Sequence, residues 1–354
     1  MKVLLAEKLG ICPGVKNAIS MAEEVLKSRI RNPESRIEVY SLGPIIHNKD
    51  VVEKLAKAGL RTVDNVEDIL KTEVRRQKSE VRSEKFEIPS TVEHHVGSSG
   101  IRHAVCQYPT VVLIRSHGAA PAQIAALKKM GVNIVDATCV LVKKVQKIAE
   151  ELQRDGYKVV VVGDENHPEV QAVVGCARDV VVVADESDLH KLPKNSKLGI
   201  LCQTTQSPEY FSRMLGAIAQ YGTAPILELS ALACLKGQYP KIGAVYINTL
   251  CKEAIKRQES AVQLCKGVDI MFVLGGLESA NTRRLAELCK KYNSQTFHLQ
   301  NWIEFDKSIL FGKNIAGVTA GASTPEWIIT EFVENLEAFG PVPLETGGVD
   351  ANSG

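Results

Sequence analysis

The fold is decided by the stretch that begins Lys2-Val3-Leu4-Leu5-Ala6 and continues through Gly10-Ile11-Cys12-Pro13-Gly14-Val15 to about Ile30. The first five residues form the short apolar run of a strand. The segment after Cys12 places six apolar residues on one face at helical spacing: Val15, Ala18, Ile19, Ala22, Val25 and Leu26. The stretch therefore predicts a strand, a loop with a cysteine and a helix, and strand ends are where α/β proteins keep their ligands.

The same order of strand and helix recurs along most of the chain. Helix-like stretches follow most of the β-rich runs, which are Val3–Ala6, Val111–Arg115, Lys158–Gly163, Leu198–Gln203, Asp269–Gly275 and Asn314–Thr319. Alternating strands and helices are typical of α/β layers, so we expect an α/β fold with largely parallel sheets. A less polar region, Pro225–Tyr239, is expected to be an irregular insertion.

Cys139 repeats the context of Cys12, and Cys251 repeats it more loosely. Cys139 closes Asp136-Ala137-Thr138-Cys139 after an apolar run, and Cys251 follows Gly243–Asn248 and precedes an amphipathic stretch. Their domain-sized separations suggest three lobes around a central cavity. The predicted boundaries are 1–138, 139–250 and 251–337, with a mobile tail at 338–354.

Three thiolates can hold three irons of a cubane cluster and leave a fourth iron open to substrate, as a catalytic cluster requires. Taken singly, each of the three cysteines has an alternative use as an ordinary buried thiol. We expect the other six to be buried or incidental thiols: Cys106, Cys176, Cys202, Cys234, Cys265 and Cys289.

The composition is that of a globular protein long enough for two or three domains, with 354 residues of which 45% are hydrophobic and 24% charged. A formal net charge of +2 gives no indication of a nucleic-acid or membrane partner. The chain shows neither a signal-peptide pattern nor an apolar run long enough to span a bilayer. Nine scattered cysteines indicate thiols that are reduced or bound to metal, so the expected location is the cytoplasm.

Residues 72–108 interrupt the pattern with mixed charges at a near-repeat of seven. The composition favours a solvated insertion over a basic arm that binds a partner, because few apolar residues are available to bury. His94, His95 and Cys106 lie here, but no second pair of ligands follows at the spacing of a zinc site.

Nine short motifs in one order resemble the 4-hydroxy-3-methylbut-2-enyl diphosphate reductase family. They are Gly10–Val15, Ile46-His47-Asn48, Ser116-His117-Gly118, Asp136–Cys139, His167-Pro168-Glu169-Val170, Gln203-Thr204-Thr205, Arg257-Gln258-Glu259, Ser279-Ala280-Asn281 and Thr319–Ser323. The resemblance implies a trefoil of three α/β lobes around a 4Fe-4S cluster, with Cys12, Cys139 and Cys251 as ligands. It also implies that the diphosphate is surrounded by His47, His117, His167, Ser279, Asn281 and Ser323.

The implied reaction is reductive removal of the allylic hydroxyl, which gives isopentenyl and dimethylallyl diphosphates in the last step of the non-mevalonate isoprenoid pathway. The implied partners are the allylic diphosphate and a one-electron donor such as a ferredoxin or a flavodoxin. By the same resemblance Glu169 and Thr204 lie near the substrate hydroxyl, where a carboxyl is a natural proton donor.

Each of these residues also has a plainer interpretation. Glu169 suits the first turn of a helix that begins at Pro168, and Thr204 suits a strand. Loop histidines are often merely solvated. Ser279 and Asn281 open a helix, where capping is their ordinary role, although capping and phosphate binding are compatible.

The sequence departs from the family at several positions. Val140 replaces a proline after the second cysteine, and Ala254 and Ala280 stand where the family often has hydroxyl residues. Lost hydroxyl donors would weaken binding of a diphosphate without abolishing a cluster. These departures keep open an alternative, a non-catalytic iron-sulfur binding or redox-sensing protein descended from the reductase.

Overall fold

The structure is a computed structural model that describes residues 1–31, 37–72, 109–194, 196–222, 225–236, 243–303 and 305–339. The predicted insertion therefore lies outside the described residues from position 73 onward, as does the predicted tail from position 340. The chain divides into two compact units. We call them the terminal unit, Met1–Ile11 with Glu253–Gly354, and the middle unit, Cys12–Lys252.

The terminal unit is built on one parallel sheet with the strand order β1-β13-β11-β12. The strands are β1 (Lys2–Leu5), β11 (Ile270–Leu274), β12 (Thr296–Leu299) and β13 (Ile315–Ala320). Its helices are α9 (Lys252–Cys265), whose first residue belongs to the middle unit, α10 (Ala280–Tyr292) and α11 (Glu326–Ala338). A short 3-10 helix, η3 (Lys307–Leu310), precedes β13.

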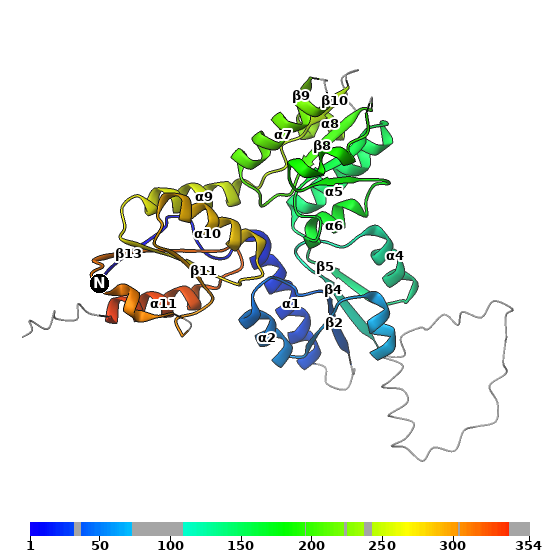
Figure 1. The fold of residues 1–354 in the computed structure, drawn as a ribbon. Helices are drawn as coiled ribbons and strands as arrows, with labels where there is room; N and C mark the ends of the chain where they lie inside the picture. The colour runs from blue at the N-terminus through cyan, green and yellow to red at the C-terminus, as the bar shows by residue number, and fades with distance from the viewer. Residues whose placement is uncertain are drawn as a thin grey trace, which may run out of the picture. The chain divides into compact units, whose positions relative to one another are not determined.

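Both faces of this sheet are covered, because successive residues of β11 point to opposite sides. Phe272 packs in one core cluster with Phe332 of α11. Its neighbour Val273 packs in another cluster with Ala261 of α9 and Leu285 of α10. Figure 1 shows the same arrangement, with α9 and α10 on one side of β11 and β13 and α11 on the other.

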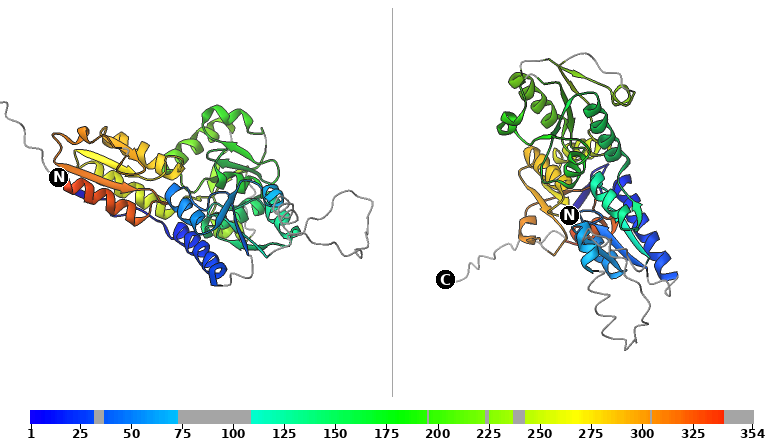
Figure 2. Two further views of the ribbon diagram at one scale, coloured as in Figure 1. Left: turned by 90° about the horizontal axis from the view of Figure 1, so that it is seen from below. Right: turned by 90° about the vertical axis from the view of Figure 1, so that its right-hand side faces the viewer.

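The middle unit contains two parallel sheets. The first has the order β3-β2-β4-β5 and consists of β2 (Glu38–Leu42), β3 (Leu60–Val63), β4 (Thr110–Ile114) and β5 (Asn133–Asp136). The second has the order β7-β6-β8-β10-β9 and consists of β6 (Lys158–Val162), β7 (Val181–Val183), β8 (Leu198–Cys202), β9 (Ile226–Glu228) and β10 (Ala244–Tyr246). In the right view of Figure 2 the green elements of the second sheet gather apart from the blue and cyan elements of the first.

The helices of the middle unit connect these strands. They are α1 (Pro13–Arg31), α2 (Lys49–Lys57), α4 (Pro121–Lys129), α5 (Val140–Arg154), α6 (Pro168–Val174), the 3-10 helix η2 (Glu186–Lys191), α7 (Pro208–Gly222) and α8 (Ala231–Leu235). No helix among the described residues is long and apolar enough to cross a membrane.

The three sheets share one strand arrangement that creates a ligand site. In each sheet two neighbouring strands are not consecutive in sequence: β2 lies beside β4, β6 beside β8, and β11 beside β13. The strand that comes between them in sequence, β3, β7 or β12, pairs with the other edge of the first of the two. Such a switch in strand order opens a crevice at the carboxyl ends of the two strands.

The three parallel sheets confirm the predicted α/β class, and all six predicted strand runs form strands. Two details differ from the expectation. The region Pro225–Tyr239 contains β9 and α8, and β9 extends a sheet beside β10. Strand β1, placed in the first lobe by the sequence analysis, pairs with β13, a partner that a local pattern cannot reveal. The lobe boundaries near Cys139 and Cys251 stay predictions.

Candidate functional site

The predicted site residues follow equivalent strands in all three sheets. In the first sheet of the middle unit, His47 follows β2 and His117 follows β4. In the second sheet, His167 and Glu169 follow β6 and Thr204 follows β8. In the terminal unit, Ser279 and Asn281 follow β11 and Ser323 follows β13. One strand further along each sheet, β5, β10 and β1 are followed by Cys139, Cys251 and Cys12. Each sheet therefore presents polar side chains at its switch point and a thiol beside them.

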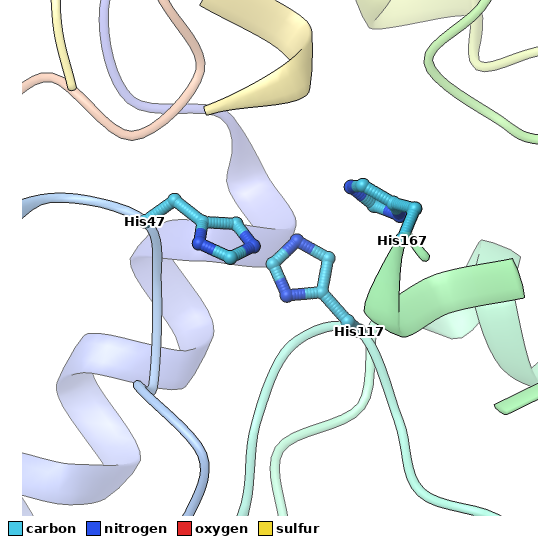
Figure 3. A group of neighbouring side chains, drawn as sticks. All are labelled: His47, His117 and His167. Carbon is cyan, nitrogen blue, oxygen red and sulfur yellow. The ribbon is translucent and has the colours of Figure 1, made fainter. Parts of the chain in front are cut away.

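Three histidines of the middle unit meet in one cluster (Figure 3). The ring centroids of His47 and His117 are 4.7 Å apart, those of His117 and His167 5.3 Å, and those of His47 and His167 6.1 Å. One nitrogen from each ring lies within 4.8 Å of the other two. Such a group can bind either a metal ion or an anion, depending on which nitrogens carry hydrogen.

The hydrogen bond of His167 favours an anion. His167 caps α6, and its Nδ1 accepts the backbone N–H of Glu169 at 3.2 Å. A neutral ring whose Nδ1 accepts must carry its hydrogen on Nε2. Nε2 is then a donor. To bind a metal, Nε2 would need a free lone pair, and the ring hydrogen would have to sit on Nδ1, where it would face the Glu169 N–H. His167 thus offers an N–H to a negatively charged group.

His117 is buried beside two other histidines and Arg115. Burial lowers its pKa well below the usual 6.5, and the nearby His47, His167 and Arg115 lower it further. Its Nδ1 is buried and has no hydrogen-bond partner among the described residues. Its surroundings therefore disfavour the protonated imidazole. A bound anion would raise the pKa of His117 again, since an adjacent negative charge favours the charged form.

Glu169 and Thr204 form a buried pair in the same unit. The Glu169 carboxylate accepts the Thr204 N–H at 2.7 Å with Oε1 and the Thr204 hydroxyl at 2.9 Å with Oε2. The glutamate is only 2% exposed. Burial raises its pKa above the usual 4.5, and the two hydrogen bonds from Thr204 oppose that rise. A carboxyl with this balance is suited to holding and releasing a proton.

Cys12 and Cys139 come together at the start of α1. A Cβ atom placed on Gly14 would lie 2.9 Å from the Cys139 Sγ and 4.0 Å from the Cys12 Sγ, so both sulfur atoms flank one point of the backbone. The Val15 N–H donates to the Cys12 Sγ at 3.4 Å. Two thiols that converge on one point are suited to ligation of a soft metal, because sulfur ligands select such metals.

Backbone hydrogen bonds connect the cysteines to the other site residues. The Cys139 N–H donates to the carbonyl of Ser116, the residue before His117, at 2.9 Å. The Cys251 N–H donates to the Thr204 carbonyl at 2.8 Å. Cys139 is thereby fixed to the histidine cluster, and Cys251 to the buried Glu169 and Thr204 pair.

The terminal unit holds the other predicted phosphate ligands. Ser279 caps α10 by accepting the Thr282 N–H, and the buried amide nitrogen of Asn281 has no partner among the described residues. Ser323 is buried in the turn after β13, and the Thr324 hydroxyl ties this turn to the Leu274 carbonyl at the end of β11 at 2.9 Å. Ser279 and Asn281 therefore lie at the N-terminus of α10, and Ser323 lies after the end of β13. Both are usual settings for phosphate ligands.

The remaining cysteines lie in other settings. Cys202, Cys234, Cys265 and Cys289 are buried, and burial raises the pKa of Cys176 to about 12. Cys106 lies outside the described residues, with His94 and His95. Cys12, Cys139 and Cys251 are all partly exposed.

Two contributors were missed by the sequence analysis. Gln146 on α5 donates to the Ala119 carbonyl at 3.3 Å and the Ala172 carbonyl at 3.4 Å, and so connects the His117 loop to α6. No sequence signal marks it. Gly14 was quoted within its motif without a role, although a glycine beside a predicted ligand cysteine is a signal of close approach.

The fold and the site define an α/β protein with three parallel sheets whose thiols, imidazoles and a buried carboxyl gather at the carboxyl ends of strands. A family model described as LytB protein matches residues 3–337, so the chain belongs to the LytB protein family.

Its relatives are named 4-hydroxy-3-methylbut-2-enyl diphosphate reductase. The protein of Citrifermentans bemidjiense is 36% identical over 341 residues, which cover 96% of this chain and 98% of that one. The protein of Aquifex aeolicus is 34% identical over 339 residues, with 95% and 96% coverage.

Solved structures agree. One described as (E)-4-hydroxy-3-methyl-but-2-enyl diphosphate reductase, the terminal enzyme of the non-mevalonate pathway, matches with a TM-score of 0.57 at 33% identity and covers 96% of this chain and all of that one. The E-1-hydroxy-2-methyl-but-2-enyl-4-diphosphate reductase of Plasmodium falciparum matches with a TM-score of 0.72 at 24% identity, covering 95% and 87%, and supports the fold alone.

Proposed function

We propose that the protein is an oxidoreductase that removes the hydroxyl of 4-hydroxy-3-methylbut-2-enyl diphosphate at an iron-sulfur cluster, as the last step of the non-mevalonate isoprenoid pathway. Its relatives carry that activity in their names over nearly the whole chain. The observation that carries the proposal is the placement of Cys12 and Cys139 beside one point, with Cys139 fixed to the histidine cluster.

The residues present fit a 4Fe-4S cluster with three cysteine ligands. Cys12, Cys139 and Cys251 each stand immediately before a helix, namely α1, α5 and α9. Cysteine sulfurs are the usual ligands of such clusters. When bound, the cluster would supply electrons one at a time together with an iron of Lewis-acid character.

The overall reaction breaks the allylic C–O bond and consumes two electrons and two protons, and the oxygen leaves as water. Glu169 is the proposed proton donor, because its buried carboxyl has a raised pKa and lies two residues after His167 of the histidine cluster. Thr204 holds that carboxyl through two hydrogen bonds and is proposed to orient the substrate hydroxyl.

The three histidines are proposed to bind the diphosphate. His167 presents a donor nitrogen, and the unsatisfied Nδ1 of His117 lies in the same cluster. We also propose Ser279, Asn281 and Ser323 as phosphate ligands, since the amide of Asn281 lacks a partner and hydroxyls at a helix start are phosphate donors. The electrons would come from a one-electron donor such as a ferredoxin or a flavodoxin. The proposed location of the protein is the cytoplasm.

The test is turnover of 4-hydroxy-3-methylbut-2-enyl diphosphate by anaerobically reconstituted protein with a strong one-electron reductant. Iron and sulfide are quantified in the same sample. Formation of isopentenyl and dimethylallyl diphosphates supports the proposal and shows that Ala254 and Ala280 are tolerated. A full cluster without product would contradict it and favour the non-catalytic iron-sulfur protein.

A further inference from the structure

Gly14 occupies a position where any side chain would meet a cysteine sulfur. It is the second residue of α1, directly after Cys12 and Pro13. An added Cβ would lie 2.9 Å from the Cys139 Sγ, closer than real Cβ atoms approach a neighbour, and 3.4 Å from the Cys139 Cβ. The crowding therefore falls on the residue that is predicted to bind iron.

The backbone itself does not require glycine here. Gly14 is not among the residues with positive φ, and it lies within a helix, where alanine is the more favourable residue. Its small size has to be explained by the neighbouring sulfur atoms. In the apoprotein of a Gly14→Ala variant, we expect Cys139 to relieve the contact by rotating its side chain, since one torsion moves its Sγ.

A bound cluster removes that freedom, because an iron–sulfur bond fixes the position of the Sγ. Cys139 is also restrained at its backbone, where its N–H donates to the Ser116 carbonyl at 2.9 Å and its carbonyl accepts the Lys143 N–H at 3.0 Å. The backbone of Cys139 thus has little room to retreat from a new methyl group.

We propose that Gly14 is a positioning residue that keeps the space between Cys12 and Cys139 open for an iron-sulfur cluster. The role rests on the proposed function, since it presumes that these two cysteines ligate the cluster. It makes a specific claim: a methyl group at position 14 impairs cluster binding while leaving the apoprotein folded.

The experiment compares Gly14→Ala with wild type and with Gly216→Ala as the matched control. Gly216 also lies within a helix, α7, but a Cβ added there would meet nothing within 4 Å. After identical anaerobic reconstitution, iron and sulfide per chain are measured, followed by the rate of iron loss to a chelator. Thermal unfolding of the three apoproteins checks the fold.

We expect Gly14→Ala to retain less than half of the wild-type iron, or to lose it at least tenfold faster, with an apoprotein that unfolds no earlier than wild type. Gly216→Ala should match wild type in both. Equal loading and equal loss in Gly14→Ala would overturn the role, and so would equal impairment in Gly216→Ala or an unfolded Gly14→Ala apoprotein. A wild-type chain that takes up no iron would overturn the proposed function together with this role.

Discussion

At the scale of single residues, the pKa of Glu169 is set by two opposing effects. Burial disfavours the carboxylate and raises the pKa, while the N–H and the hydroxyl of Thr204 stabilise the carboxylate and lower it. The His-Pro-Glu motif pointed to Glu169 from the sequence. Its pairing with Thr204, 35 residues further along the chain, only the fold could show.

We expect Glu169→Gln to lower turnover by a factor of about 10² to 10⁴, the usual contribution of a general acid. Glutamine has the same shape and still accepts the Thr204 N–H, but its amide has no acidic proton to transfer. Iron content should equal that of wild type, which separates a lost proton donor from a lost cluster. Near-normal turnover in this variant would refute the role.

Replacing Thr204 should also shift the pH dependence of turnover. A general acid acts while protonated, so turnover falls as pH rises through the pKa of Glu169. Thr204→Val removes the hydroxyl that stabilises the carboxylate, so this pKa rises and the alkaline limb of the pH–rate profile moves to higher pH. An alkaline limb that stays in place or moves to lower pH would contradict the assignment.

At the scale of elements, α5 connects the two sheets of the middle unit through Gln146. The side chain binds the carbonyl of Ala119, two residues after His117, and the carbonyl of Ala172 within α6, the helix that His167 caps. The close approach of Gly175 to Ala120 fixes the same two segments, since a Cβ on Gly175 would lie inside contact distance of the Ala120 Cβ. The relative position of His117 and His167 depends on these contacts.

Gln146→Leu removes two hydrogen bonds at a cost of about 1 kcal/mol each, so the histidine cluster loosens and binding of inorganic pyrophosphate should weaken by up to about 30-fold. Titration calorimetry at fixed pH measures the change. Gln153→Leu is the matched control, since Gln153 lies on the same helix and donates to the Arg178 carbonyl, away from the histidines. Equal weakening in both variants would assign the effect to general stability instead.

Elements with a clean local pattern were predictable. The helix after Cys12 and the helix start at Pro168 both appear as expected. Strand β2 was not predicted, because Glu38 and Ser41 interrupt its apolar run. The structure buries both: Glu38 pairs with Arg61 at 3.1 Å, and the Ser41 hydroxyl donates to the Gly43 carbonyl. Buried polar residues with hydrogen-bonding or charged partners are compatible with a core strand, but they break the apolar run by which a strand is predicted from sequence.

At the scale of the whole molecule, the cysteine pattern was the most informative part of the sequence. It indicated three α/β segments, and the structure has three parallel sheets with a cysteine after the equivalent strand of each. The partner strand of β1 could not be predicted from the sequence, because the pairing joins Lys2 to Ile315, and the residues near β1 carry no signal of so distant a partner. The meeting of His47, His117 and His167 likewise depends on two sheets at once.

We propose that the cysteines after β1, β5 and β10 together hold one iron-sulfur cluster. The most direct test is the iron content of single Cys→Ala variants of Cys12, Cys139 and Cys251 after anaerobic reconstitution. Cys176→Ala is the control, because Cys176 is also partly exposed but has a raised pKa. We expect each of the three variants to fall well below wild type and the control to equal it. A full complement of iron in any of the three, or its loss in Cys176→Ala, would contradict the account.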